Sequence, residues 1–255
     1  MIDTNVHLSR WPFRRLRGDE PADLAAHLRE RKAEQAWAGS FDGLLHKDIG
    51  AANTRLAADC RKYGSGFLLP FGEIHPGLPD WQEDMRLCHE QHKMPGIRLH
   101  PAYHGYTLKD RVFADVLAQA AKRALAVQLV ASMEDERTQH PLVRVPSLDL
   151  APLADVVRST PGLRLLVSNY GHPTLAKQIA AAGKVYFDFA MLEGPGHLAR
   201  LLDDVSQERV VFGSHFPLFY FEAAVLKVKE AGLNEAQTKA VFTDNARRFL
   251  QVDVS

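Results

Sequence analysis

Side chains capable of acid–base or binding chemistry recur where the strands of this 255-residue chain are expected to end. The first group opens the chain, where Asp3, Asn5 and His7 are spaced two residues apart. Successive side chains of a strand point to opposite faces, so this spacing places all three on one side. Polar groups that face an interior need hydrogen-bonding partners. The opening segment therefore predicts a functional site around His7.

Histidines follow several of the later predicted strands as well. Imidazole exchanges protons near neutral pH, which suits general acid–base catalysis. Seven of the 12 histidines lie at such positions, namely His7, His75, His100, His104, His140, His172 and His215. Their concentration at strand ends favours one shared site over seven separate structural histidines.

Alternating strands and helices are expected to position these residues. The predicted strands cover residues 2–6, 35–40, 67–71, 96–99, 125–130, 163–167, 185–189 and 209–213. Helices are expected to begin after a cap at Ser147 and to cover residues 173–182, 221–231 and 234–250. This order predicts an α/β fold, a single (β/α)8 TIM barrel over residues 1–255 with an extra C-terminal helix. The alternative, an open doubly wound sheet, calls for a glycine-rich phosphate turn after the first strand, and the sequence has none there.

Composition narrows the class of protein. The 31 basic and 31 acidic residues cancel, so net charge gives no reason to expect nucleic-acid or membrane binding. Cys60 and Cys88 are too few for a disulfide framework. The chain opens directly into a strand, without the pattern of a signal peptide. We expect a reduced, cytoplasmic protein that binds a small molecule, and its oligomeric state stays open.

Four segments together resemble a known family. They are the Asp-x-Asn-x-His opening, Gly96–Pro101, Gly213–Pro217 and Asp244–Leu250. The chain is similar over nearly its whole length to the amidohydrolase superfamily. The closest resemblance is to the amidohydrolase-2-like branch of TIM-barrel metal-dependent hydrolases, which includes lactonases and decarboxylases.

The resemblance implies one or two divalent metals, yet this chain departs from the family's ligand pattern. Asn5, Val130 and Asn169 stand where the family has histidines, and His215 stands where it has an aspartate, whereas His7 matches. Valine cannot ligate a metal, and an amide oxygen is a weak ligand for zinc. We therefore expect no tightly bound cofactor. The alternative is a weak zinc site formed by His7 and His215.

These observations predict a lactonase-like hydrolase that acts without metal on a small anionic lactone, ester or amide. A lactonase of the superfamily that acts on a pyrone dicarboxylate is similar in dispensing with metal, and arginines hold its carboxylates. His215 is the predicted general base, and His7 or His100 would polarise or protonate the reacting oxygen. The residues predicted to bind substrate are Asn5, Arg14, Arg98, His104, Glu134, Arg137, His140 and Asn169.

A second interpretation is a degenerate barrel of the same family that binds a ligand or partner without catalysis. Replacement at most of the metal positions is what such decay would produce. Decay predicts apolar or random replacements, however, whereas Asn5, Asn169 and His215 can all form hydrogen bonds. That favours a remodelled site. The long loop 132–146 is expected to close over it.

Overall fold

Seven parallel strands form one curled sheet in the computed structural model, which describes residues 1–171 and 174–251. The strands pair in chain order, from β1 to β7. Their bounds are β1 Ile2–Leu8, β2 Gln35–Ser40, β3 Leu68–Glu73, β4 Gly96–Leu99, β5 Ala126–Val130, β6 Arg164–Ser168 and β7 Val185–Phe187. The carboxyl ends of parallel strands meet at one edge, so this sheet gathers the side chains that follow the strands.

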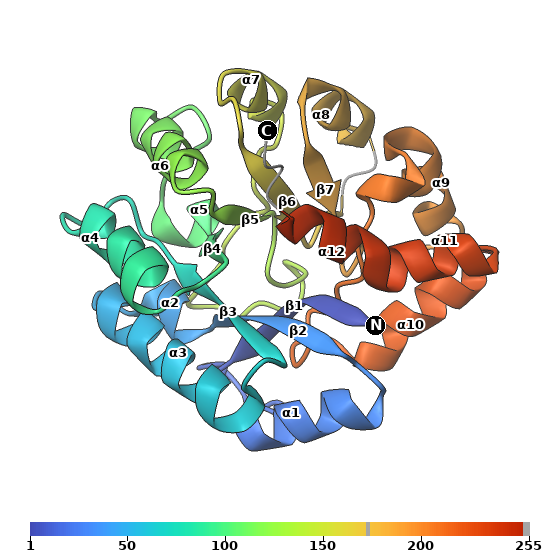
Figure 1. Ribbon diagram of the computed structural model, residues 1–255, viewed down its shortest axis with the longest axis horizontal. Helices are drawn as coiled ribbons and strands as arrows, with labels where there is room; N and C mark the ends of the chain where they lie inside the picture. The colour runs from blue at the N-terminus through green and yellow to red at the C-terminus, as the bar shows by residue number, and fades with distance from the viewer. Residues whose placement is uncertain (172–173, 252–255) are drawn as a thin grey trace.

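Helices cover the outside of the sheet (Figure 1). The longer ones are α1 Pro21–Glu30, α3 Ile49–Gly64, α6 Arg111–Lys122, α9 His197–Val205 and α10 Phe221–Glu230. The shorter ones are α2 Asp42–Leu45, α4 Trp81–Arg86, α5 Pro101–His104, α7 Leu153–Arg158, α8 Ala176–Ala182, α11 Glu235–Lys239 and α12 Asn245–Leu250. Within the described ranges, no helix has the length and apolar character needed to cross a membrane.

The segment after α9 differs from its prediction as an eighth strand. In the described chain, residues 209–216 form only two isolated bridges: Val210 pairs with Phe187 on one side, and Phe216, beyond the predicted strand, pairs with Val6 on the other. The segment still contacts both edge strands, because Val211 N donates to Phe187 O and Thr4 N donates to Phe212 O, both at 2.9 Å. The left-handed backbone of His215, at φ 59°, is incompatible with a regular strand continuing through the turn.

Two helix boundaries also differ from the sequence predictions. Ser147 was expected to cap a helix, but α7 begins at Leu153, after an irregular approach. The helix predicted at 173–182 is α8, which begins at Ala176, and Pro173 lies outside the described residues. The closing helix consists of α11, a π-helical segment Ala240–Asp244 and α12.

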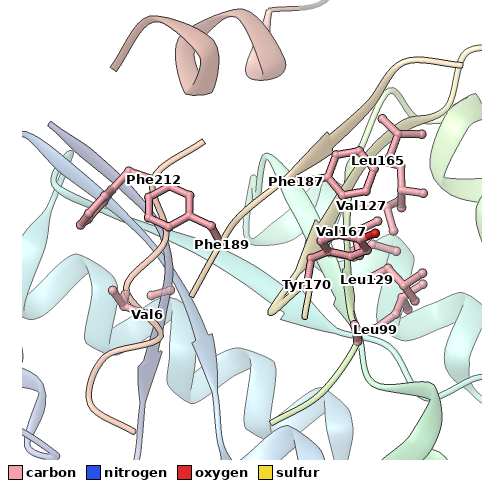
Figure 2. Close-up of a cluster of buried hydrophobic side chains, with 14 of the residues drawn as sticks. Val6, Leu99, Val127, Leu129, Leu165, Val167, Tyr170, Phe187, Phe189 and Phe212 are labelled. Atoms are coloured by element: carbon pink, nitrogen blue, oxygen red, sulfur yellow. The ribbon is translucent and has the colours of Figure 1, made fainter. Parts of the chain in front are cut away.

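Buried apolar side chains form three clusters. The outer cluster packs the sheet against the helices and includes Val127, Leu129, Leu165 and Val167, which Figure 2 shows together. The inner cluster lies on the other face and includes Ile2, Trp37, Phe71, Ala126, Leu166, Tyr186 and Phe249. Residues of the two clusters alternate along β5 and β6, as the two faces of a strand require.

A bulge in β1 changes which face its side chains meet. Pairing with β2 shifts register between Asp3 and Val6. Ile2 accordingly packs in the inner cluster, whereas Val6, four residues later, packs in the outer one. Bulges re-aim side chains in this way. Here the bulge sets the direction of Asn5 and His7.

Asn53 of α3 fixes the carboxyl end of β3. Its side chain is buried, donates from Nδ2 to Glu73 O at 2.8 Å and accepts from Glu73 N at 2.7 Å. The amide thus pairs both backbone groups of Glu73.

Replacing Asn53 by alanine should destabilise the protein strongly. The Asn53→Ala change leaves a buried N–H and a buried carbonyl of Glu73 without this partner, which costs about 2 to 3 kcal/mol. Urea unfolding followed by circular dichroism measures the loss. The neighbouring Thr54→Ala removes exposed contacts with Gly50 O and His92 Nε2 and should stay within about 0.5 kcal/mol of the parent. Equal losses in the two variants would contradict this role for Asn53.

Candidate functional site

Polar side chains converge beneath the mouth formed by the strand ends. They are each at most 2% exposed, and they come from five strands, from the segments that follow them, or from the turn at residue 215. We call this set the buried polar centre: Asn5, His7, Glu73, Arg98, His100, Asn169, Asp188 and His215. Its members are ionisable groups or primary amides, so their contacts decide their protonation states.

Arg98 joins the strands around the buried polar centre. Its guanidinium donates to Gln128 Oε1 at 2.7 Å, Val6 O at 3.2 Å and Trp37 O at 3.3 Å. The fourth contact joins Nη1 to His7 Nε2 at 2.8 Å. A Cβ at Gly39 would stand 2.5 Å from the same Nη1, so the absence of a side chain there makes room for the guanidinium.

The contact with Arg98 fixes the state of His7. A guanidinium only donates, so His7 Nε2 must accept, and the proton of the neutral ring lies on Nδ1. That Nδ1 has no hydrogen-bond partner among the described residues. Burial, and then the Arg98 charge, hold the pKa of His7 well below its ordinary value. His7 is therefore a hydrogen-bond donor rather than a base.

His100 and Glu73 form a buried acid–base pair. His100 Nδ1 lies 2.7 Å from Glu73 Oε2, while His100 Nε2 has no partner within the described chain. Burial raises the pKa of Glu73 to about 8, and burial together with Arg98 lowers the pKa of His100 well below its usual range. The rings of His7 and His100 are 6.4 Å apart, which lets one small molecule contact both.

His215 is held by groups that carry no formal charge. Its Nε2 lies 2.7 Å from Met133 O, so Nε2 donates, and Nδ1 lies 3.3 Å from Asn169 Nδ2. Burial lowers the pKa of His215 to about 3. His215 and Asn169 both have left-handed backbones, at φ 59° and 57°. Such conformations in residues other than glycine concentrate at functional sites.

The amides of Asn5 and Asn169 fill the positions that resemble metal-ligand positions. Asn5 Nδ2 donates to Asn169 Oδ1 at 2.7 Å and to Asp188 Oδ2 at 2.9 Å. Asn169 Nδ2 donates to Ser132 O at 2.6 Å. The amide nitrogens of both residues and Asn169 Oδ1 are therefore committed to bonds with protein groups, whereas Asn5 Oδ1 has no hydrogen-bond partner among the described residues.

The donor set of the buried polar centre does not fit a divalent metal. The Nε2 lone pair of His7 accepts from the Arg98 cation, and Nε2 of His215 carries a proton. Among the residues that the structure describes, no three His, Cys, Asp or Glu side chains are placed to hold a metal ion. The expectation that no cofactor is tightly bound stays a prediction.

Two loops close over the buried polar centre. Their apolar contacts form the mouth cluster, made of Trp11, Phe41, Leu44, Val130 and Met133. The first loop covers residues 9–20, between β1 and α1, and the second covers residues 132–146, after β5. Arg14 Nη1 of the first loop pairs with Glu134 Oε1 of the second at 2.6 Å, and the Phe13 and His140 rings stack with their centroids 5.3 Å apart. Loop 132–146 thus covers the mouth, as its length predicts, and we call it the lid.

The structure brings together six of the residues predicted to form the site. Asn5, His7, Arg98, His100, Asn169 and His215 all belong to the buried polar centre. Arg98, however, points its guanidinium at protein groups below His7, so a substrate contact would need a different arrangement from the one seen here. His104 lies beside the centre and contacts Gly43 O through Nε2 at 3.0 Å.

Other predicted site residues lie outside the centre. Arg14 and Glu134 join the two covering loops, and His140 stacks on the lid's outer side. Arg137 pairs with Asp135, and its side chain is 81% exposed. His172 lies outside the described residues.

Glu73 and Asp188 also belong to the centre; the sequence places both at the ends of predicted strands, but no binding or reacting role was predicted for either. Glu73 ends β3, and Asp188 directly follows β7. The available signal was position, since an acidic residue that ends a predicted buried strand is a candidate for the mouth.

The sequence matches a family described as amidohydrolase over residues 2–252, so the chain belongs to that family. Among curated proteins, no sequence matches this chain. Solved structures with the same fold include 2,6-dihydroxybenzoate decarboxylase from Rhizobium, with TM-score 0.74, 13% identity and coverage of 98% of this chain and 99% of that one. The 5-carboxyvanillate decarboxylase from Sphingomonas paucimobilis has TM-score 0.73, 12% identity and coverage of 99% of each chain. These likenesses establish the fold.

Asp3 ties the turn before His215 to β1. Its carboxyl accepts from Ser214 Oγ at 2.5 Å, Ser214 N at 3.0 Å and Asn5 N at 3.1 Å. These bonds favour the anion, but burial outweighs them and raises the pKa of Asp3 to about 7 from 3.8.

The raised pKa of Asp3 makes the protein's stability depend on pH. The folded state holds this proton more tightly than the unfolded state, so the stability it contributes is full below the unfolded pKa and is lost as pH rises through the folded one. Asp3→Asn removes this loss and preserves two acceptor contacts. Its free energy of unfolding should gain at least about 1 kcal/mol over the parent between about pH 5 and about pH 7. Denaturant titrations at both pH values test this, and the exposed Asp23→Asn should follow the parent.

The Arg14–Glu134 pair should control opening of the lid. Glu134→Ala removes a charge-assisted bond and leaves Arg14 without that partner, so amide exchange in residues 131–147 should rise about tenfold, equivalent to about 1.4 kcal/mol. Hydrogen exchange with mass spectrometry measures it. Arg137→Ala, which breaks an exposed pair on the same loop, should change exchange less than about twofold. If both variants behave alike, the pair does not hold the lid.

Proposed function

We propose that this protein is an enzyme that hydrolyses a small anionic lactone, ester or amide without a metal. His100, supported by Glu73, acts first as the general base and then as the general acid. One observation carries the proposal. His100 presents an unpartnered, buried Nε2 with a carboxyl group bonded to its other nitrogen, in the described chain. That is the arrangement of an oriented general base.

The proposed reaction uses His7 and His100 on one substrate. His100 Nε2 takes a proton from water as the water oxygen bonds to the carbonyl carbon. The His7 Nδ1–H donates to the carbonyl oxygen, which gains negative charge as its double bond opens. When the carbonyl re-forms, the bond to the leaving oxygen or nitrogen breaks, and His100 returns the proton to that atom.

Arg98 supports His7 without contacting the reacting atoms. It holds the ring in the Nδ1–H tautomer through the contact at Nε2. Burial lowers its pKa to about 10, so it keeps its charge at neutral pH. A buried cation behind the donor favours charge on the oxygen that forms.

The contacts favour His100 over His215 as the base. A carboxyl group touches His100 and can stabilise its protonated ring, whereas His215 contacts a carbonyl and an amide. His215 would then orient Asn169 and the lid through Met133 O. The original prediction for His215 stays open to the same experiment.

Two features support an anionic substrate. Among the described residues, Arg98 forms no ion pair with a carboxylate within 4 Å, and it interacts with the charges of Glu73, Asp188 and Asp3 only at longer range, so its positive charge adds to the potential that a bound anion would meet. The Rhizobium decarboxylase of the same fold has been solved in complex with 2,6-dihydroxybenzoate. A carboxylate on the substrate would therefore meet a favourable potential.

Decarboxylation of a small aromatic acid is the second candidate. The mouth cluster contains two aromatic rings, Trp11 and Phe41, 5.1 Å apart, and Phe13 packs against it 5.5 Å from Trp11. Such a cover would hold an aromatic ring and exclude water from a carboxylate that leaves as CO2. For this reaction His100 would first take a proton from solvent at Nε2 and would then donate it to the ring carbon as the bond to the carboxyl group breaks and CO2 leaves.

Turnover by His100→Asn and His215→Asn tests the proposal. A panel of carboxylated lactones, esters, amides and hydroxybenzoates, each beside its neutral analogue, first identifies a substrate. His100→Asn should lower kcat at least about a hundredfold because asparagine cannot accept the proton. His215→Asn should lower kcat less than about tenfold if His215 only orients its neighbours.

The opposite order would assign the base to His215. Melting temperatures of both variants, measured beside the parent, separate loss of chemistry from loss of folding. Acids from the panel that raise the melting temperature without any turnover would instead favour the interpretation of a barrel that binds without catalysis.

A further inference from the structure

Glu73 stands between two histidines. Its Oε2 contacts His100 Nδ1 at 2.7 Å, and its Oε1 faces His104 Nδ1 at 3.9 Å. His104 is the last residue of α5, and His100 directly precedes that helix. The other nitrogen of His104, Nε2, lies 3.0 Å from Gly43 O. A carbonyl only accepts, so Nε2 carries the proton of the neutral His104 ring, and Nδ1 has a lone pair.

The facing atoms of Glu73 and His104 are both unpaired. Glu73 Oε1 and His104 Nδ1 are buried without a hydrogen-bond partner in the described residues. Each side chain is at most 2% exposed. Buried orphan atoms call for an explanation, and here two of them face one another. A gap of 3.9 Å is closed by a small side-chain rotation or by one water.

We propose that His104 accepts the proton of Glu73 when His100 becomes protonated. In the resting state Glu73 is neutral, with its proton on Oε1, and Oε2 accepts the Nδ1–H of neutral His100. When His100 Nε2 gains a proton, the O–H bond at Oε1 breaks and an N–H bond forms at His104 Nδ1. Glu73 becomes an anion between two imidazolium rings, and the two facing atoms, Glu73 Oε1 and His104 Nδ1, become each other's partners.

This inference rests on the proposed function, because it concerns the strength of the same base. Without His104, a protonated His100 would face a neutral carboxylic acid. With His104, it faces a carboxylate, which favours the charged ring. His104 touches no substrate in this scheme and acts through Glu73, so it is a positioning residue.

The other charged or titratable groups around the trio modify the balance without replacing His104. Arg98 favours the Glu73 anion, whereas burial opposes it. His75 stacks on His104 at 3.9 Å, and His100 and His75 both oppose charge on His104. Burial raises the pKa of Tyr106 and of Cys88 away from neutrality, and electrostatic repulsion by Glu73 raises both further. His104 is the one of these groups with an orphan nitrogen aimed at Glu73.

Imidazole titrations by nuclear magnetic resonance test the transfer without any substrate. In the parent protein, the rings of His100 and His104 should become charged in the same step as pH falls. In His104→Gln, whose side-chain amide can still donate to Gly43 O, His100 should titrate about one pH unit lower. In Glu73→Gln, His104 should no longer follow His100. His75→Gln removes a stacked ring that does not face Glu73 and should leave both titrations together.

Three results would overturn the proposal. One is a His104 ring that stays neutral over the whole pH range in which the parent is folded. Another is an unchanged His100 titration in His104→Gln. The third is an equal change in His75→Gln, which would assign the effect to packing. Because none of these measurements requires turnover, they stay decisive if the hydrolase proposal fails, and the activity of His100 can be judged separately.

Discussion

The bond from Arg98 to His7 is the constraint on which the rest of the buried polar centre depends. A guanidinium enclosed by the sheet costs several kcal/mol unless its donors are satisfied. Gln128, two backbone carbonyls and His7 accept from four of its five N–H groups. Because Nε2 of His7 accepts from Arg98, it cannot act as a base, and the proton of the ring lies on Nδ1, which can donate. Acid–base work is left to His100 and its neighbours.

The same cation rationalises the departure from the family's metal pattern. A positive charge already stands behind His7, so a divalent cation in contact with that ring would meet repulsion as well as a missing lone pair. Asparagines at positions 5 and 169 suit this arrangement because a neutral amide both donates and accepts. They bond with each other and with Asp188. Histidines at the same positions could become cations beside Arg98, whereas amides stay neutral.

Much of this architecture follows from the sequence because strand alternation is local. The spacing of Asn5 and His7, and the apolar strands that carry Val127 or Leu165, specify which side chains meet. The eighth strand was predicted from an apolar run alone, and that run cannot reveal the left-handed turn at His215. The burial of individual arginine side chains could not be predicted from the sequence either. Arg98, Arg137 and Arg14 read alike in the sequence, yet one is enclosed, one is in water and one pairs with the lid.

The closed mouth has a kinetic consequence. Arg14 and Glu134 are 120 positions apart in the chain, so entry requires two independently anchored loops to separate together. Arrival and departure of any small molecule are then limited by the frequency of this opening rather than by diffusion to the surface. A molecule that binds under the lid would show slow onset and a long residence time even if its contacts were few. Affinity measured after brief mixing would therefore understate what the buried polar centre can hold.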